Sequence, residues 1–171
     1  MSDRFKLKSD YCYSLFRFYE DAEIQSIVHH FKYQGMKKLS YFMGCHEGSN
    51  IIKNISGLNI SETDIITPIT LFKTKFRERG YNQSEYLARG INTVLNLNYY
   101  PDLLIRIKNT RTQTQLNLEE RKENLKNAFI LNEKFKHALI NKNIIIIDDV
   151  VTSGSTLNEA IKVLKIGRAH V

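Results

Sequence analysis

The segment IIIIDDVVTSGST, residues 144–156, combines two neighbouring carboxylates with a cluster of hydroxyls. Asp148 and Asp149 follow four isoleucines, and serines and threonines then surround Gly154. Ionised carboxylates accept hydrogen bonds from sugar hydroxyls and are the oxygen ligands that Mg²⁺ prefers. A glycine among hydroxyls at the start of a helix favours phosphate, because a helix N-terminus presents unpaired N–H groups and partial positive charge. The segment therefore predicts a site for a ribose 5-phosphate group.

The two halves of the segment are assigned to different parts of this ligand. Asp148 and Asp149 would contact the vicinal ribose hydroxyls, directly or through Mg²⁺, and the phosphate is assigned to Thr152, Ser153, Gly154, Ser155 and Thr156. The alternative is a strand end with solvated acids, followed by an ordinary Ser/Thr helix cap. A haloacid-dehalogenase-type phosphatase fits poorly, since its DxD pattern would require an acid at Val150.

The residues around this segment predict the elements that hold it. Residues 144–147 are a short β-branched run, as expected for a strand covered on both faces of a parallel sheet. The following helix has an apolar stripe at Leu157, Ala160, Ile161 and Leu164. Ligands in open α/β sheets bind at the carboxyl ends of the strands, which is where Asp148 and Asp149 would lie.

Upstream patterns predict further strands and helices. One strand, within residues 63–70, ends at a turn near Pro68, and another covers residues 103–108. Helices are predicted over 24–35 and around Met36 to Met43. Strands that alternate with helices indicate an α/β fold, with a mainly parallel, twisted sheet flanked by helices.

Two capping-box patterns mark further helix starts. Asn82 is followed three residues later by Glu85, and Asn117 is followed in the same way by Glu120. The helix from Asn82 is predicted to bury a stripe formed by Leu87, Ile91, Val94 and Leu95.

Composition favours one cytoplasmic domain. The chain has 171 residues, 42% hydrophobic and 25% charged, with no apolar stretch long enough for a membrane span. Cys12 and Cys45 lack a CxxC spacing and are predicted to be free thiols. The net charge of +7 favours polyanionic partners or a solvated basic surface, and cations concentrate in LFKTKFRERGYNQ, residues 71–83.

The last six residues, IGRAHV, are predicted to be a non-native tail. They can be encoded by ATC GGA AGA GCA CAC GTC, a string that matches a common sequencing-library adapter. We therefore expect one native domain over residues 1–165 and a read-through tail over 166–171, with the native chain continuing differently after Lys165. The helix from 157 would normally return the chain to another parallel strand, which also predicts C-terminal truncation.

The acidic segment resembles the phosphoribosyl pyrophosphate (PRPP) motif of type I phosphoribosyltransferases. Three further blocks resemble the ComF family, which is associated with competence for DNA uptake: FKYQG at 31–35, RERGYNQSEYLA at 77–88, and residues 106–129, which include TQLNLEERKENLKNAF. The resemblance covers residues 24–165, with Thr70 in place of a more usual family proline. It implies PRPP as substrate, Mg²⁺ as cofactor and glycosyltransferase chemistry in nucleoside metabolism.

The resemblance also assigns roles outside the PRPP motif. The turn after Pro68 and the basic segment would hold pyrophosphate, with Lys73, Arg77, Arg79 and Asn82 as candidates; for Lys73 and Lys75 a surface basic loop is equally supported. The block from 106 to 129 would contribute Arg106, Thr110, Gln115, Arg121 and Asn124, of which the last two suit bracing of a helix start equally well. Within it, KNTRTQTQ is predicted to be a mobile loop that closes over the ligand. Arg77 and Arg106 join the acid pair as catalytic candidates. Tyr81 suits base stacking or the core.

Three functions follow from these assignments. The first is transfer of a phosphoribosyl group from PRPP to an acceptor. The second is a non-catalytic, PRPP-sensing protein of DNA uptake that works with other competence proteins. The third is direct binding of single-stranded DNA by the basic segment with its interleaved Phe72, Phe76 and Tyr81.

Overall fold

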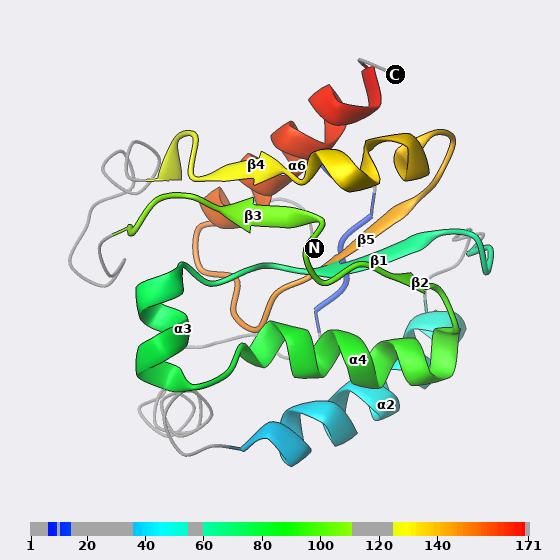
Figure 1. Ribbon diagram of the computed structural model, residues 1–171. Coiled ribbons are helices and arrows are strands. Elements are labelled where there is room, and N and C mark those ends of the chain that lie inside the picture. Colours follow the sequence, from blue (N-terminus) through cyan, green and yellow to red (C-terminus); the bar gives the residue numbers. More distant parts are fainter. Residues whose placement is uncertain (1–6, 10, 15–35, 55–59, 111–124, 170–171) are drawn as a thin grey trace.

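A parallel three-stranded sheet lies at the centre of the protein (Figure 1). The computed structural model describes residues 7–9, 11–14, 36–54, 60–110 and 125–169. The predicted helix over 24–35, the Asn117 cap and the candidates Gln115, Arg121 and Asn124 lie outside these residues.

The sheet has the strand order β2-β1-β5. Strand β1 (Ile65–Pro68) pairs in parallel with β2 (Asn98–Tyr99) on one side and with β5 (Ile144–Ile147) on the other. Ile65 is opposite Ile144, and Pro68 is opposite Ile147. Strand β1 is buried throughout, whereas the first three residues of β5 are half-buried. The predicted parallel sheet and the isoleucine strand are confirmed.

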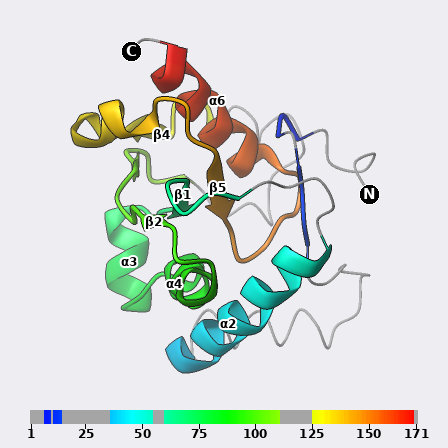
Figure 2. The ribbon, with the colours of Figure 1, turned by 90° about the vertical axis from the view of Figure 1, so that its right-hand side faces the viewer.

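Helices cover both faces of this sheet (Figure 2). On one face, Ile144 and Ile146 pack with α6 (Ser155–Ala169) against a core that includes Leu103, Ala160 and Leu164. On the other face, Ile145 and Ile147 pack in the core of α4 (Gln83–Leu95), whose neighbour is α2 (Lys37–Asn54). The alternating isoleucines of β5 therefore contribute to two separate cores, as a strand covered on both faces should.

The predicted strand over 103–108 does not belong to the parallel sheet. Strand β3 (Leu104–Arg106) instead forms an antiparallel pair with β4 (Phe129–Leu131), which is followed by the 3₁₀ helix η2 (Glu133–Leu139). Parallel strands need a crossover of a dozen or more residues, and only residues 100–103 separate β2 from β3. The short connection therefore excludes β3 from a parallel place beside β2.

Two glycines bring α2 and α4 into close contact. A Cβ atom on Gly44 would lie 2.9 Å from the Cα of Gly90, and the converse distance is also 2.9 Å. The predicted helix end at Met43 is wrong, because α2 continues through these small residues to Asn54. The predicted burial of Val94 is also wrong: this side chain is 37% exposed, on the flank of the contact beside Gly48.

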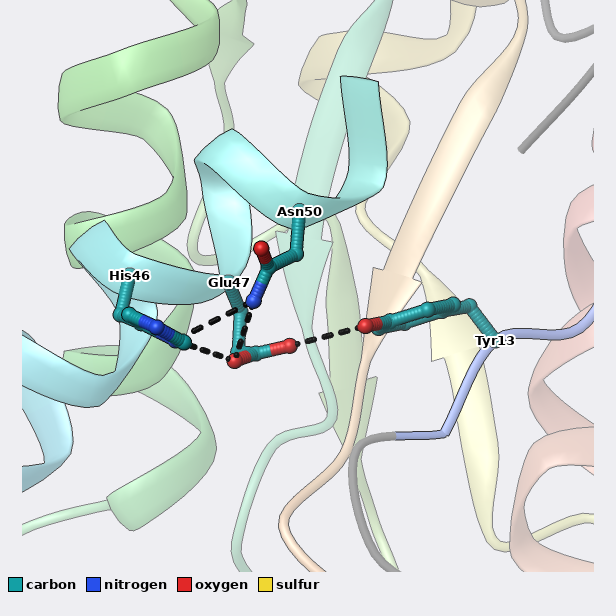
Figure 3. Close-up of polar contacts among 4 residues, drawn as sticks. All are labelled: Tyr13, His46, Glu47 and Asn50. Atoms are coloured by element: carbon teal, nitrogen blue, oxygen red, sulfur yellow. Dashed lines mark hydrogen bonds and ion pairs between the residues drawn. The ribbon is translucent and has the colours of Figure 1, made fainter. Parts of the chain in front are cut away.

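The N-terminal segment is attached to both helical layers. The Lys8 amide donates a 2.8 Å hydrogen bond to Asn158 Oδ1, and Lys165 Nζ donates to the Lys8 carbonyl at 2.9 Å. Farther along, the Tyr13 hydroxyl donates to Glu47 Oε2 at 3.1 Å (Figure 3). The segment therefore connects α6 on one face of the sheet with α2 on the other.

Several smaller predictions concern the chain as a whole. Cys12 and Cys45 are free thiols, as predicted. None of the helices in the described ranges is long and apolar enough to cross a membrane. Helix α6 extends through Ile166 and Gly167, which packs against Leu131. The read-through origin of the tail concerns the gene and stays a prediction.

Candidate functional site

The acid pair lies at the carboxyl edge of the parallel sheet. Strand β5 ends at Ile147, so Asp148 and Asp149 begin the loop that leads to α6. The amide of Ile69, just after β1, donates a 2.8 Å hydrogen bond to the Ile147 carbonyl. This bond places the turn after β1 beside the loop that carries the acids, as expected for neighbouring parallel strands.

The two carboxylates are held by the chain itself and by Ser84. The Asp149 amide donates to Asp148 Oδ1 at 3.0 Å and to Ser84 Oγ at 3.2 Å. Ser84 Oγ also lies 3.4 Å from the Oδ1 atom of each acid. Burial, together with the neighbouring Asp149 carboxylate, raises the pKa of Asp148 well above its ordinary value. A bound cation would oppose both effects, since it favours ionised carboxylates.

The hydroxyl loop shares a pocket with Asp148. Asp148 and residues 150–157 line this pocket. Gly154 has a φ of +72°, a left-handed conformation that glycine adopts without steric cost. The Ser155 amide donates to Ser153 Oγ at 3.4 Å, and the two hydroxyls are 2.9 Å apart. Helix α6 begins here with no acidic residue in its first turn, which leaves its N-terminal end suited to an anion.

Arg106 reaches the same edge from β3. Burial lowers the pKa of its guanidinium, Asp148 raises this pKa, and the charge of Arg79 lowers it again. The side chain contacts the Thr110 hydroxyl and lies over the Phe129 ring at 5.4 Å. Its buried Nε has no hydrogen-bond partner within the described part of the chain. Arg106 is thus influenced electrostatically by an acid and by a second arginine, and a bound anion would offset the repulsion between the two guanidinium groups.

The basic segment is a short helix and not a loop. Helix α3 (Lys73–Arg79) ends at Gly80, whose φ is +72° and whose amide donates to the Phe76 carbonyl at 2.8 Å. Lys73 and Arg77 are exposed on this helix, whereas Arg79 is half-buried. Of the α3 cations, Arg79 is therefore the one whose charge acts on Arg106.

The predicted capping box at Asn82 and Glu85 is wrong. Asn82 precedes α4, but its side chain makes no cap hydrogen bond. Its Nδ2 instead donates to the Ile69 carbonyl at 2.9 Å, and Glu85 pairs with Arg89 at 2.6 Å. The buried Asn82 side chain therefore holds the turn after β1. This hydrogen bond stabilises the fold more than a helix cap would, because water can take the place of the cap.

Thr70 secures the same turn from its other side. The Thr70 hydroxyl donates to the Leu104 carbonyl at 3.0 Å. Thr70 therefore joins the turn after β1 to the strand that carries Arg106.

The structure decides the role of Tyr81 and adds Ser84 to the candidate site. Tyr81 is 3% exposed, and its ring meets Tyr86 edge-on at 5.9 Å with Lys37 Nζ 5.5 Å from its centre. It belongs to the core and does not offer a face to a base. Ser84 was missed. Its position in the first turn of α4 was the available signal, because that end of the helix lies at the carboxyl edge of the sheet.

Comparisons with known proteins agree with this arrangement. Residues 84–171 match the family model of the phosphoribosyl transferase domain. Competence protein F of Haemophilus influenzae is 36% identical over 102 residues, which are 60% of this chain and 44% of that protein. The DNA utilization protein YhgH of Escherichia coli K12 is 35% identical over 101 residues, 59% of this chain and 43% of that protein.

A third relative, YhgH of Shigella flexneri, is 33% identical over 112 residues, 66% of this chain and 47% of that protein. The chain spans less than half the length of these curated relatives. The match to the domain model covers just over half of the chain and includes the acid pair, the hydroxyl loop and Ser84. The chain therefore belongs to the phosphoribosyl transferase domain family and, within it, to the ComF group.

Proposed function

We propose that the protein binds PRPP with Mg²⁺ at the carboxyl edge of its parallel sheet and transfers the phosphoribosyl group to an acceptor. The observation that carries this proposal is the pocket lined by Asp148 and residues 150–157. In this pocket the Asp148 carboxylate, which is suited to ribose hydroxyls, adjoins a loop and a helix N-terminus suited to phosphate.

The acid pair fits the requirements of a magnesium–PRPP complex. In enzymes Mg²⁺ is often bound by one or two carboxylates together with water and substrate phosphates. In the described residues, no group of three or more His, Cys, Asp or Glu side chains could hold a metal by itself. Asp148 and Asp149 would therefore hold Mg²⁺ jointly with the ligand, directly or through the ribose hydroxyls. When bound, the ion supplies positive charge to the pyrophosphate.

The arginines complete the proposed reaction. The bond between the ribose anomeric carbon and the pyrophosphate oxygen breaks, pyrophosphate leaves with the bonding pair, and a nucleophile of the acceptor bonds to the same carbon. Arg106 and Arg79 would neutralise the departing pyrophosphate; the electrostatic influence of Asp148 and Arg79 on Arg106 supports this assignment. Arg77 and Lys73, exposed on α3, would add longer-range attraction for the anion.

The printed names of the relatives supply the biological context. Competence protein F and DNA utilization protein YhgH are named for the uptake or use of DNA. We infer that this protein acts in the same setting, in the cytoplasm. A PRPP-sensing role without turnover would use the same pocket, and a screen of acceptors for pyrophosphate release separates the two.

Calorimetric titration of the full-length protein with PRPP and Mg²⁺ tests the proposal. Wild-type protein should bind, and the double variant Asp148→Asn/Asp149→Asn should lose binding because the amides cannot accept as the carboxylates do. Glu62→Gln, at an exposed acid away from the edge of the sheet, is the matched control. Absence of PRPP binding by wild-type protein would contradict the proposed function.

Helix α3 supports a second candidate, binding of single-stranded DNA. Its exposed Lys73 and Arg77 flank Phe76, which is 46% exposed and able to stack on a base. Affinity for an oligonucleotide should then fall steeply with salt, and Lys73→Gln/Arg77→Gln should flatten that dependence. If the double variant retained the wild-type salt slope, α3 would not be the DNA contact.

A further inference from the structure

Ser84 is a buried hydroxyl at the centre of the proposed site. It is 2% exposed and lies in the first turn of α4, outside the loop that lines the pocket. Its Oγ is 3.4 Å from Asp148 Oδ1, 3.4 Å from Asp149 Oδ1, and accepts from the Asp149 amide at 3.2 Å. One side chain therefore contacts both carboxylates and the backbone that joins them.

We propose that Ser84 is a positioning residue, which fixes the orientation of the Asp148–Asp149 pair for the ribose hydroxyls and Mg²⁺ of PRPP. This inference rests on the proposed function and adds a residue from outside the acidic motif. A hydroxyl has one proton to donate and can accept at the same time. Ser84 accepts from the Asp149 amide while its proton lies within reach of either carboxylate, which reduces the repulsion between the acids.

The rigidity of α4 makes Ser84 suitable for this role. The acids lie on a loop after an edge strand, which by itself would hold them loosely. Helix α4, by contrast, is packed closely on α2 through Gly44 and Gly90. Its start is fixed by the Asn82 side chain, which donates to the Ile69 carbonyl. Ser84 thus anchors the acid loop to a well-packed helix.

The orientation of α4 adds an electrostatic contribution. The N-terminal end of a helix carries partial positive charge, which stabilises nearby carboxylates. Because Ser84 lies in the first turn, this end of α4 faces the acid pair. The helix and the hydroxyl therefore favour the same ionised, ligand-binding state of the acids.

Ser40 provides a matched control. It is also a buried serine, 3% exposed, but its hydroxyl donates to the Met36 carbonyl, just before α2, at 3.3 Å. Ser40→Ala and Ser84→Ala therefore remove the same group from equally buried places, and they differ in whether the acid pair loses a contact. Ser84→Cys preserves the volume of the side chain but weakens its hydrogen bonding.

The test titrates these variants of the full-length protein with PRPP–Mg²⁺ by calorimetry and with inorganic phosphate by amide chemical shifts. Ser84→Ala and Ser84→Cys should bind PRPP about tenfold more weakly, as expected for a lost hydrogen bond to a charged group. Both should bind phosphate as the wild type does, because phosphate probes the hydroxyl loop alone. Ser40→Ala should match the wild type with both ligands.

Three results would overturn the inference. Wild-type PRPP affinity in Ser84→Ala would show that the hydroxyl is dispensable, while the proposed function would stand. Full recovery of PRPP affinity in Ser84→Cys would show that Ser84 acts only by filling space. Equal loss of phosphate and PRPP would indicate general damage to the site. If the wild type did not bind PRPP, the proposed function would fail and this inference with it.

Discussion

Burial lowers the pKa of the Arg106 guanidinium, and the Asp148 carboxylate opposes this shift electrostatically. They come from separate sheets, since Arg106 lies on the antiparallel β3–β4 pair and Asp148 follows the parallel strand β5. The hydrogen bond from the Thr70 hydroxyl to the Leu104 carbonyl links the two sheets beside this pair. The candidate site therefore depends on how the two sheets are joined.

The first prediction concerns Arg106. Arg106→Gln should weaken PRPP binding roughly tenfold to a hundredfold, because it removes a partly buried cation from the proposed pyrophosphate position. Arg106→Lys should recover only part of the affinity, since an ammonium lacks the planar, two-pronged geometry of guanidinium. Titration calorimetry measures both effects. Arg89→Lys is the control, at an arginine on the exposed side of α4. Full recovery in Arg106→Lys would show that charge alone matters there.

The second prediction concerns the glycine contact between α2 and α4. In Gly44→Ala the new Cβ would collide with the Leu87 carbonyl, and in Gly90→Ala with the Tyr41 carbonyl. These atoms are backbone and cannot move aside, so each variant should lose about 3 kcal/mol of unfolding free energy or more. Denaturant unfolding provides the measurement.

Gly80→Ala is an informative comparison for the same experiment. Gly80 has a φ of +72° but no atom within 4 Å of its would-be Cβ. It should lose only about 1 kcal/mol, from backbone strain without collision. Similar losses at all three glycines would contradict a steric origin for the α2–α4 effect.

The parallel layer could be predicted from the sequence because its signals are local. A β-branched run followed by acids, hydroxyls and an amphipathic stripe specifies β5, the site loop and α6 within a few tens of residues. The pocket of Asp148 and residues 150–157 could thus be predicted from one continuous segment of sequence. The length of α2 could not be predicted in this way, because Gly44 and Gly48 lower the helix propensity of the segment. Their presence in the helix is explained by the close approach of α4.

The contacts that the sequence did not define are those between distant segments. Asn82 and Glu85 match a capping box, yet Asn82 bonds to Ile69, thirteen positions earlier. Ser84 meets the acids across more than sixty positions. Such long-range partners override a local pattern whose own stabilisation is only about 1 kcal/mol.

The third prediction concerns Asp64, a carboxylate that is 3% exposed at the start of β1. Burial alone would raise its pKa, but hydrogen bonds from the Ser61 amide and from the amide and side chain of Asn143, each 3.0 Å long, together lower the pKa of Asp64 below its ordinary value. Asp64→Asn should therefore cost about 2 kcal/mol of unfolding free energy at neutral pH.

The pH dependence of this loss follows from the lowered pKa. The ionised form is stabilised in the fold, so its contribution is complete above the unfolded-state pKa of about 3.9 and disappears as pH falls through the folded value. Urea unfolding should show a constant difference between wild type and Asp64→Asn from pH 7 to about 5, which narrows below about pH 4. Asp102→Asn, at an exposed acid, should show no such difference. A gap that widened on acidification would contradict this account.

The fourth prediction concerns the attachment of the N-terminal segment to α2. Glu47 is 4% exposed; it accepts from Tyr13 through Oε2 and from Asn50 Nδ2 at 3.2 Å through Oε1, and His46 Nδ1 lies 2.7 Å from Oε1 (Figure 3). Burial, and then Glu47, raise the pKa of Tyr13 above the ordinary value of a phenol. Tyr13→Phe should cost about 1 kcal/mol, and Glu47→Ala about 3 kcal/mol, because Glu47→Ala leaves several donors without an acceptor.

A double-mutant cycle isolates the Tyr13–Glu47 contact from these other losses. If the hydroxyl acts through Glu47, Tyr13→Phe should cost almost nothing in the Glu47→Ala background, which gives a coupling energy of about 1 kcal/mol. Hydrogen exchange of residues 11–14 should accelerate equally in both single variants, since either one detaches the segment from α2. Additive losses would mean that Tyr13 stabilises the fold by a contact other than the one with Glu47.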